Sequence, residues 1–210
     1  MSLTLILVII TGLISYNSFS NRVMYQKLLL HPFTMKREGE YTRFITHGFV
    51  HADMNHLMIN MFVLYMFGQQ IESNFLQLFG DVMGRVYFLL LYLGAIVLSS
   101  VQTYFKHQNN SYYSAVGASG GTSAIVFAYI VFDPWAWFVF PPLPALFFGI
   151  AYLVYSIYMS KKANDNIGHE AHLWGSVWGL VLTVSLTAAL RPDFMENIIT
   201  RLMAGPSSPF

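Results

Sequence analysis

Long uncharged, apolar stretches alternate along the chain with short segments that hold most of the charged residues. A helix that crosses the hydrocarbon core of a bilayer needs about 20 mostly apolar residues. Prolines end or kink helices, so the cluster at Pro141, Pro142 and Pro144 interrupts the apolar sequence in the second half of the chain. The pattern predicts six membrane-spanning helices, over residues 3–19, 53–72, 86–105, 115–132, 143–160 and 167–190.

The composition supports this interpretation. Hydrophobic residues make up 55% of the chain and charged residues only 10%, whereas soluble chains carry about 25% charged residues. The net charge of +1 provides no basic field for nucleic acid. The absence of cysteine excludes disulfides, thiolate zinc sites and a cysteine nucleophile. We therefore expect an all-α, polytopic membrane helix bundle, with one domain over residues 1–190 and a short tail over 191–210, surrounded by lipid.

Both ends of the chain allow another interpretation. Residues 3–19 could form a cleaved signal peptide, but they lack a basic n-region and an A-x-A cleavage site, and their apolar core is too long. We predict a membrane span there. The tail ends in Gly205, Pro206 and Pro209, and we expect it to be frayed.

The basic residues bear on orientation. With the N-terminus inside, three of them lie on the inner side and eight on the outer side, so the positive-inside rule favours an N-terminus outside. If the first loop folds into the interface, the remaining count is three against three. The inner residues are Arg85, Arg191 and Arg201, and the outer ones are Arg22, Lys27, Lys36, Arg37, Arg43, Lys106, Lys161 and Lys162.

Histidines and an asparagine gather where the second span begins. Polar side chains inside a membrane are costly and are functional hypotheses by default. His56 and Asn60 are four residues apart, share one helix face and can aim donors at a common point. They could instead only bridge helices. A metal site formed by His47, His51 and His56 is a further alternative, although no acidic or cysteine partner lies at ligand spacing.

The fourth span opens with a serine among small residues. Gly117, Gly121, Ala124 and Ala128 recur at helical spacing, which is typical of closely packed membrane helices. Ser119 is expected at the helix N-terminus, where unpaired N–H groups and the helix dipole favour a developing negative charge. The serine suits the role of a nucleophile beside an oxyanion site, or that of a simple N-cap.

The sixth span pairs a histidine with glycines. His172, Gly175 and Gly179 fall on one helix face, which predicts that another backbone approaches the histidine. A serine and a histidine on two closely packed helices match what a nucleophile and base require. Glu170 points to a different face. The unit would therefore be a Ser–His dyad without a carboxylate.

Two other classes of protein need to be weighed. His169-Glu170-Ala171-His172 is one residue short of the H-E-x-x-H zinc motif, which makes an intramembrane zinc protease the second enzymatic candidate. A transporter would predict internal repeats, and the two halves show no convincing repeat.

Several segments together resemble the rhomboid family of intramembrane serine proteases, over about residues 38–180. The matching segments are Glu40 to Phe49, the HxxxN of His56 and Asn60 within the stretch from His51, Gly68 to Glu72, the GxSG of Gly117-Ala118-Ser119-Gly120, and the AHxxGxxxG of Ala171-His172 with Gly175 and Gly179. Their order and their positions in the predicted spans agree with the family. A lone GxSG would be a weak signal, but the set together is a strong one.

The resemblance implies a six-helix bundle with a water-accessible active site below the outer surface and both termini in the cytoplasm. It assigns Ser119 as the nucleophile and His172 as the general base. His56, Asn60 and the Ser119 N–H would form the oxyanion hole. The residues expected to pack backbones closely are Gly117, Gly120, Gly121, Gly175 and Gly179.

This chain departs from the family pattern at two places. The Trp–Arg pair of the first loop is Thr42-Arg43 here. Many members carry an aromatic residue one turn after the serine, stacked on the histidine, whereas this chain has Ser123. His172 must therefore be held by glycine, alanine or other side chains. Inactive relatives generally lack the serine or the histidine, and this chain keeps both.

The resemblance implies hydrolysis of peptide bonds in or near transmembrane segments of other membrane proteins, without a metal or cofactor. A non-catalytic binding or chaperone module of the same fold is the main alternative. The fifth span, rich in aromatics, is either a displaceable gate or lipid-facing packing. We expect Asn164, Asp165 and Asn166 to cap the site, and the compact form favours a multi-pass protein of a bacterial inner membrane.

Overall fold

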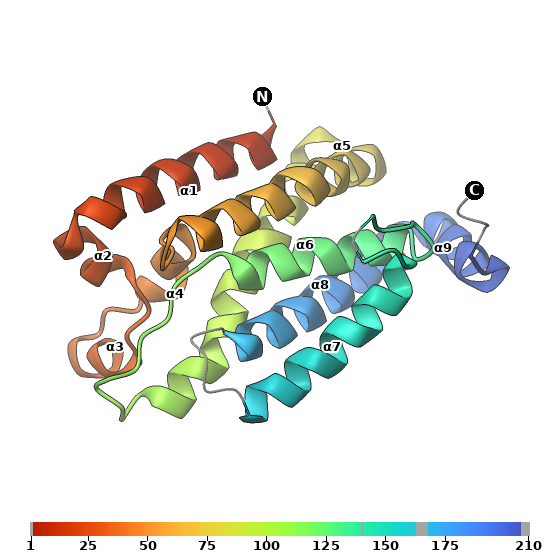
Figure 1. Ribbon diagram of the computed structural model, residues 1–210. Coiled ribbons are helices and arrows are strands. Elements are labelled where there is room, and N and C mark those ends of the chain that lie inside the picture. Colours follow the sequence, from red (N-terminus) through yellow and green to blue (C-terminus); the bar gives the residue numbers. More distant parts are fainter. Residues whose placement is uncertain (1, 140, 163–167, 207–210) are drawn as a thin grey trace.

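The computed structural model describes residues 2–139, 141–162 and 168–206, and these are helical apart from loops and two isolated bridges. Figure 1 shows α6 between α5 and α8, with α7 beside α8 at the edge of the bundle. The elements are α1 (Leu3–Ser20), α2 (Arg22–Leu28), α3 (Pro32–Glu38), α4 (Arg43–Thr46), the 3-10 turn η1 (His47–Phe49), α5 (Met54–His107), α6 (Ser119–Phe132), α7 (Ala145–Lys162), α8 (His169–Leu190) and α9 (Pro192–Ala204).

The predicted helices are present, and α5 joins two of them. It has 54 residues and is interrupted at Gly80, whose φ of 80° and ψ of 170° are not helical. Within the described residues, α1, α5 and α8 are long and apolar enough to cross a membrane, and α6 is a shorter apolar helix. The predicted start of the sixth span, residue 167, lies outside the described residues.

Two boundaries differ from the prediction. The fourth span was expected to begin near Ala115, but Ala115 exchanges backbone hydrogen bonds with Leu30, and α6 begins only at Ser119. The tail was expected to be frayed, but α9 occupies most of it. Proline is well placed at the first position of α9, and Phe194 lies 5.8 Å from the ring of Phe132.

The first helix is polar inside and apolar outside. Thr4, Thr11 and Ser15 are buried against the bundle, while Ile9 and Leu13 are exposed. Small polar residues at helix contacts and apolar residues outside are expected when the surroundings are lipid. The pattern supports α1 as a membrane span.

Glu72 of α5 binds the N-terminus of α1. Its carboxylate accepts hydrogen bonds from the Leu3 and Thr4 N–H groups, at 2.7 and 2.9 Å, and from the hydroxyls of Ser2 and Thr4. A carboxylate at this position satisfies N–H groups that have no partner within the helix and is favoured by the helix dipole. This contact holds α1 against the first half of α5.

Arg43 holds the folded first loop together. Its guanidinium is buried, donates to the carbonyls of Gln26 and Leu29 at 2.8 and 2.7 Å, and pairs with Glu40 at 2.6 Å. The loop between α1 and α5 is therefore folded. Arginine suits this role because its planar fork of donors can bind several acceptors at once.

We expect Arg43→Gln to destabilise the protein by about 2 kcal/mol, because the buried Leu29 carbonyl, the part-buried Gln26 carbonyl and a carboxylate lose a charged donor. This corresponds to a thermal midpoint about 5 °C lower in detergent. The control Arg37→Gln changes an exposed arginine of α3 and should leave the midpoint unchanged. Equal midpoints for the two variants would contradict this role of Arg43.

Candidate active site

The loop before α6 determines where Ser119 lies. Gly117 has a φ of +118°, which favours glycine, and its N–H donates to the His47 carbonyl at 2.9 Å. The chain then enters α6 with Ser119 as the first helical residue. Ser119 is half-buried, and the first N–H groups of a helix have no partner within it. The serine hydroxyl thus lies beside donors that can bind an oxyanion.

His51 holds the backbone just before this serine. The Ala118 N–H donates to Nε2 of His51 at 3.3 Å, so the proton of the ring is on Nδ1, which lies 2.8 Å from the Ser15 hydroxyl. That hydroxyl in turn donates to the Phe49 carbonyl at 3.1 Å. Burial lowers the pKa of His51 to about 3, so the ring is neutral at pH 7. The chain of hydrogen bonds connects α1 to the start of α6.

The three histidines considered as metal ligands have other contacts. Nδ1 of His47 donates a hydrogen bond to the Arg43 carbonyl at 2.9 Å. His51 contacts the Ala118 N–H and the Ser15 hydroxyl. The ring of His56 lies 4.9 Å from that of His51. In the part of the chain that the structure describes, no three His, Asp or Glu side chains form a group that could hold a metal ion.

His56 and Asn60 lie against the first turn of α6. A Cβ on Gly117 would come within 2.6 Å of the His56 ring, so the histidine occupies space that only glycine leaves free. Oδ1 of Asn60 accepts a hydrogen bond from the Thr122 hydroxyl at 3.1 Å, and Nδ2 donates to the His56 carbonyl at 2.9 Å. The second N–H of the Asn60 amide can serve another acceptor.

The glycines of α6 and α8 bring the two backbones into contact. A Cβ on Gly175 would overlap the Gly120 backbone, and one on Gly179 would overlap the backbone of Ala124. Gly120 and Gly121 also leave room for α5, whose Ser99 and Tyr92 side chains occupy the place of a Cβ there. Gly117, by contrast, serves the loop rather than this helix contact.

Three contacts link His172 to the face of α6 that carries Ser119. His172 is one turn before Gly175, which touches the residue after the serine. Its ring is stacked on Tyr152 of α7, with centroids 6.0 Å apart and an angle of 25°. The Tyr152 hydroxyl lies 3.0 Å from that of Ser123, one turn after Ser119 on the same helix face.

The carboxylate nearest to His172 in sequence serves another purpose. Glu170 pairs with Lys106 at the end of α5. The ring of His169 lies 6.0 Å from that of His172 at an angle of 80°, and 5.6 Å from Tyr155. Residues 164–166, expected to cap the site, lie outside the described residues.

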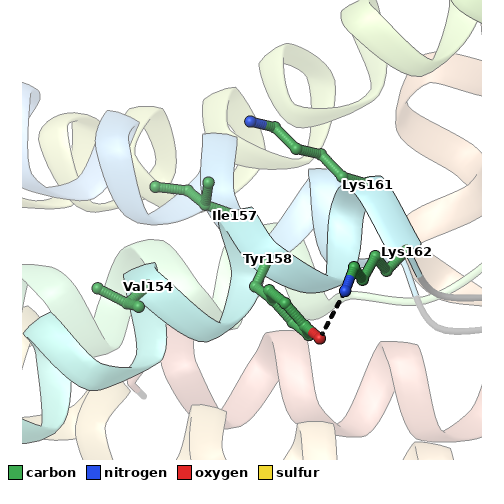
Figure 2. A pocket seen from close by; sticks show the side chains of 5 residues that line it. All are labelled: Val154, Ile157, Tyr158, Lys161 and Lys162. Carbon is green, nitrogen blue, oxygen red and sulfur yellow. Dashed lines mark hydrogen bonds between the residues drawn. The ribbon is translucent and has the colours of Figure 1, made fainter.

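The aromatic residues of α7 point in different directions. Tyr152 faces the site. Figure 2 shows Tyr158 at a shallow hollow near the C-terminal end of the helix, where its hydroxyl accepts a hydrogen bond from Nζ of Lys162 at 3.1 Å. Sequence reasoning missed Tyr152, because nothing distinguishes it from the other aromatics of α7. The replacement of an aromatic by Ser123 was the one signal that a ring had to come from elsewhere.

Comparisons with known proteins show what this chain is similar to. The family model described as Rhomboid domain matches residues 38–189. RHOMBOID-like protein 12, mitochondrial, of Arabidopsis thaliana is 30% identical over 74% of this chain, and the match spans 50% of that relative. Rhomboid protease GlpG of Haemophilus influenzae is 27% identical over 78% of both chains. Putative rhomboid protease YdcA of Bacillus subtilis is 28% identical over 69% of this chain and 67% of its own length.

Proposed function

Because this chain belongs to the rhomboid family, we propose that it is an intramembrane serine endopeptidase that hydrolyses peptide bonds in or near transmembrane segments of other membrane proteins. Ser119 is the nucleophile, and His172 is first the general base and then the general acid. His56, Asn60 and the Ser119 N–H form the oxyanion hole.

The observation that carries the proposal is the meeting of three helices at the first turn of α6. His56 and Asn60 come from α5, Ser119 from α6 and His172 from α8. Ser119, His56 and His172 are half-buried, so a substrate can reach them. Polar groups are expensive at such depth, and their convergence at one point favours a shared chemical task.

The length of α6 supports a site below the membrane surface. At 1.5 Å per residue, its 14 residues span about 21 Å, whereas the hydrocarbon core is about 30 Å thick. We propose six spans, formed by α1, the two halves of α5, α6, α7 and α8, with both termini in the cytoplasm. Ser119 then lies within the outer part of the bilayer.

The reaction follows from these positions. The Ser119 hydroxyl attacks the scissile carbonyl while His172 accepts its proton, and the oxyanion binds the helix-terminal N–H with His56 and Asn60. His172 then gives the proton to the leaving amine, and water hydrolyses the acyl-enzyme. A substrate helix must unwind locally, because its amides are otherwise hydrogen-bonded, so small or helix-breaking residues should surround the cleaved bond.

We propose the inner membrane of a bacterium as the location. The two bacterial relatives match over 78% and 67% of their own lengths, whereas the mitochondrial relative from Arabidopsis matches over 50%. The partners are then transmembrane substrates and the surrounding lipid.

Purified protein in liposomes, incubated with a model transmembrane substrate, tests the activity. We expect cleavage that resists chelators, and labelling by a fluorophosphonate probe that peptide mass spectrometry assigns to Ser119. Loss of cleavage with a chelator but not with the probe would favour a zinc protease. Neither cleavage nor labelling would favour a non-catalytic rhomboid-like module.

A further inference from the structure

Helix α7 is attached to the bundle in an unusual way. Its buried residues are the small Ala145, Gly149 and Ser156, whereas α6 buries large side chains such as Ile125 and Phe127. Small buried residues provide little contact area of their own, so other side chains must hold α7 in place. Figure 1 shows the helix at the edge of the bundle, where α8 is its main neighbour.

A row of aromatic rings in contact, two pairs tilted and two stacked, contributes to this attachment. Phe138 lies 5.0 Å from Phe148, Phe148 lies 5.9 Å from Tyr152, and Tyr152 lies 6.0 Å from His172. Phe67 of α5 continues the row at 5.5 Å from Phe138. The row therefore runs from the first half of α5, along α7, to the histidine of α8.

The end of this row is fixed by a hydrogen bond to α6. The hydroxyl of Tyr152 lies 3.0 Å from that of Ser123, which is buried. Tyr152 thus contacts α6 through its hydroxyl and α8 through its ring. One side chain of α7 connects the helix of the serine to the helix of the histidine.

We propose that Tyr152 is the positioning residue of His172, so that the Ser–His pair is competent only while α7 is seated against α8. This inference rests on the proposed function. Among the residues that the structure describes, Glu170 is the carboxylate nearest to His172 in sequence, and it is paired with Lys106 rather than with the imidazole. The flat face of Tyr152 restricts the imidazole instead, since offset stacking favours one ring orientation.

The consequence is an order of events. Movement of α7 away from the bundle, as admission of a substrate helix would require, withdraws the ring from His172 and disables the base. Proton transfer can begin only after α7 has returned. The arrangement would thereby limit reaction to substrates that let α7 close.

Tyr152→Leu tests the positioning role. We expect kcat to fall about tenfold with KM unchanged, and the rate of fluorophosphonate labelling to fall by the same factor, because the probe needs the Ser–His pair but not the entry of a helix. Tyr152→Phe keeps the ring and should stay within about threefold of wild type. The control Tyr158→Leu changes an exposed tyrosine of α7 that contacts Lys162 rather than the site, and this variant should be labelled at the wild-type rate.

The hydrogen bond between Ser123 and Tyr152 allows an independent test. Ser123→Ala and Tyr152→Phe remove opposite ends of the same contact, so we expect equal small effects and no further loss in the double variant. If the double variant instead loses as much labelling rate as the two single variants together, Ser123 does not act through its hydrogen bond to Tyr152.

Gly149→Val tests the dependence on α7 without changing Tyr152. A Cβ there would come within 2.8 Å of the end of the Ile130 side chain and 3.5 Å of the Phe127 ring on α6. The two further carbons of valine need more room than a shift of Ile130 alone provides, so α7 should move outward and labelling should slow. The control Ile150→Val alters the next, exposed residue and should label normally.

The outcomes separate this inference from the proposed function. Wild-type protein that neither cleaves nor labels overturns the proposed function. Active wild type with normal labelling in both Tyr152→Leu and Gly149→Val overturns the inference alone. A change in KM without a change in labelling would likewise overturn it, because α7 would then act only in substrate entry.

Discussion

Replacement of Ser119 by alanine is expected to abolish cleavage of a transmembrane substrate, with a loss of at least about 10⁴-fold in kcat. The other hydroxyls close by have partners, because that of Thr122 donates to Asn60 and those of Ser123 and Tyr152 contact each other. The fold should be unaffected, since the variant removes only a half-buried hydroxyl. Cleavage is measured in liposomes, and folding is checked by the thermal midpoint.

The matched variants make this result specific. Ser111→Ala changes an exposed serine between α5 and α6 and should cleave normally. His172→Ala should be as inactive as Ser119→Ala, and the double variant no worse, because residues that act as a unit are not additive. Residual cleavage by Ser119→Ala above a tenth of the wild-type rate would exclude the serine mechanism.

Gly175→Ala is expected to have the second large effect, on stability. The added methyl group would overlap the Gly120 backbone, and backbone atoms cannot swing aside as the end of a flexible side chain can. We expect a loss of about 3 kcal/mol, or about 10 °C in the thermal midpoint, together with loss of activity because α8 carries His172.

Gly12→Ala is the matched control, since it makes the same change inside another helix. A Cβ at Gly12 meets no atom within 4 Å, and alanine is the better helix former by about 1 kcal/mol. The midpoint should therefore stay constant or rise. A similar fall in both variants would show that the close contact at Gly175 is not what stabilises the fold.

Much of the fold could be predicted from the sequence, because a helix that crosses a lipid bilayer requires a long run of apolar residues. The uncharged stretches correspond to α1, the halves of α5, and α6 to α8. The break inside α5 could not be located in the same way, since Gly80 is one of many glycines and only its φ of 80° identifies it. Helix α9 was missed because it is amphipathic, with Ile198 buried and polar residues outside, whereas a membrane span is recognised by an uninterrupted apolar run.

The sequence by itself determined that lipid surrounds the protein. Polar side chains are costly in lipid, so the sequence already identified four functional candidates, Ser119, His172, His56 and Asn60. Only the tertiary structure decided that Tyr152 supports His172 and that His51 holds the backbone of Ala118. The hydrophobic periodicity of the sequence indicates which face of each helix is turned to lipid. It carries no information about which residues meet across a contact such as that between Gly120 and Gly175, where helices far apart in the chain cross.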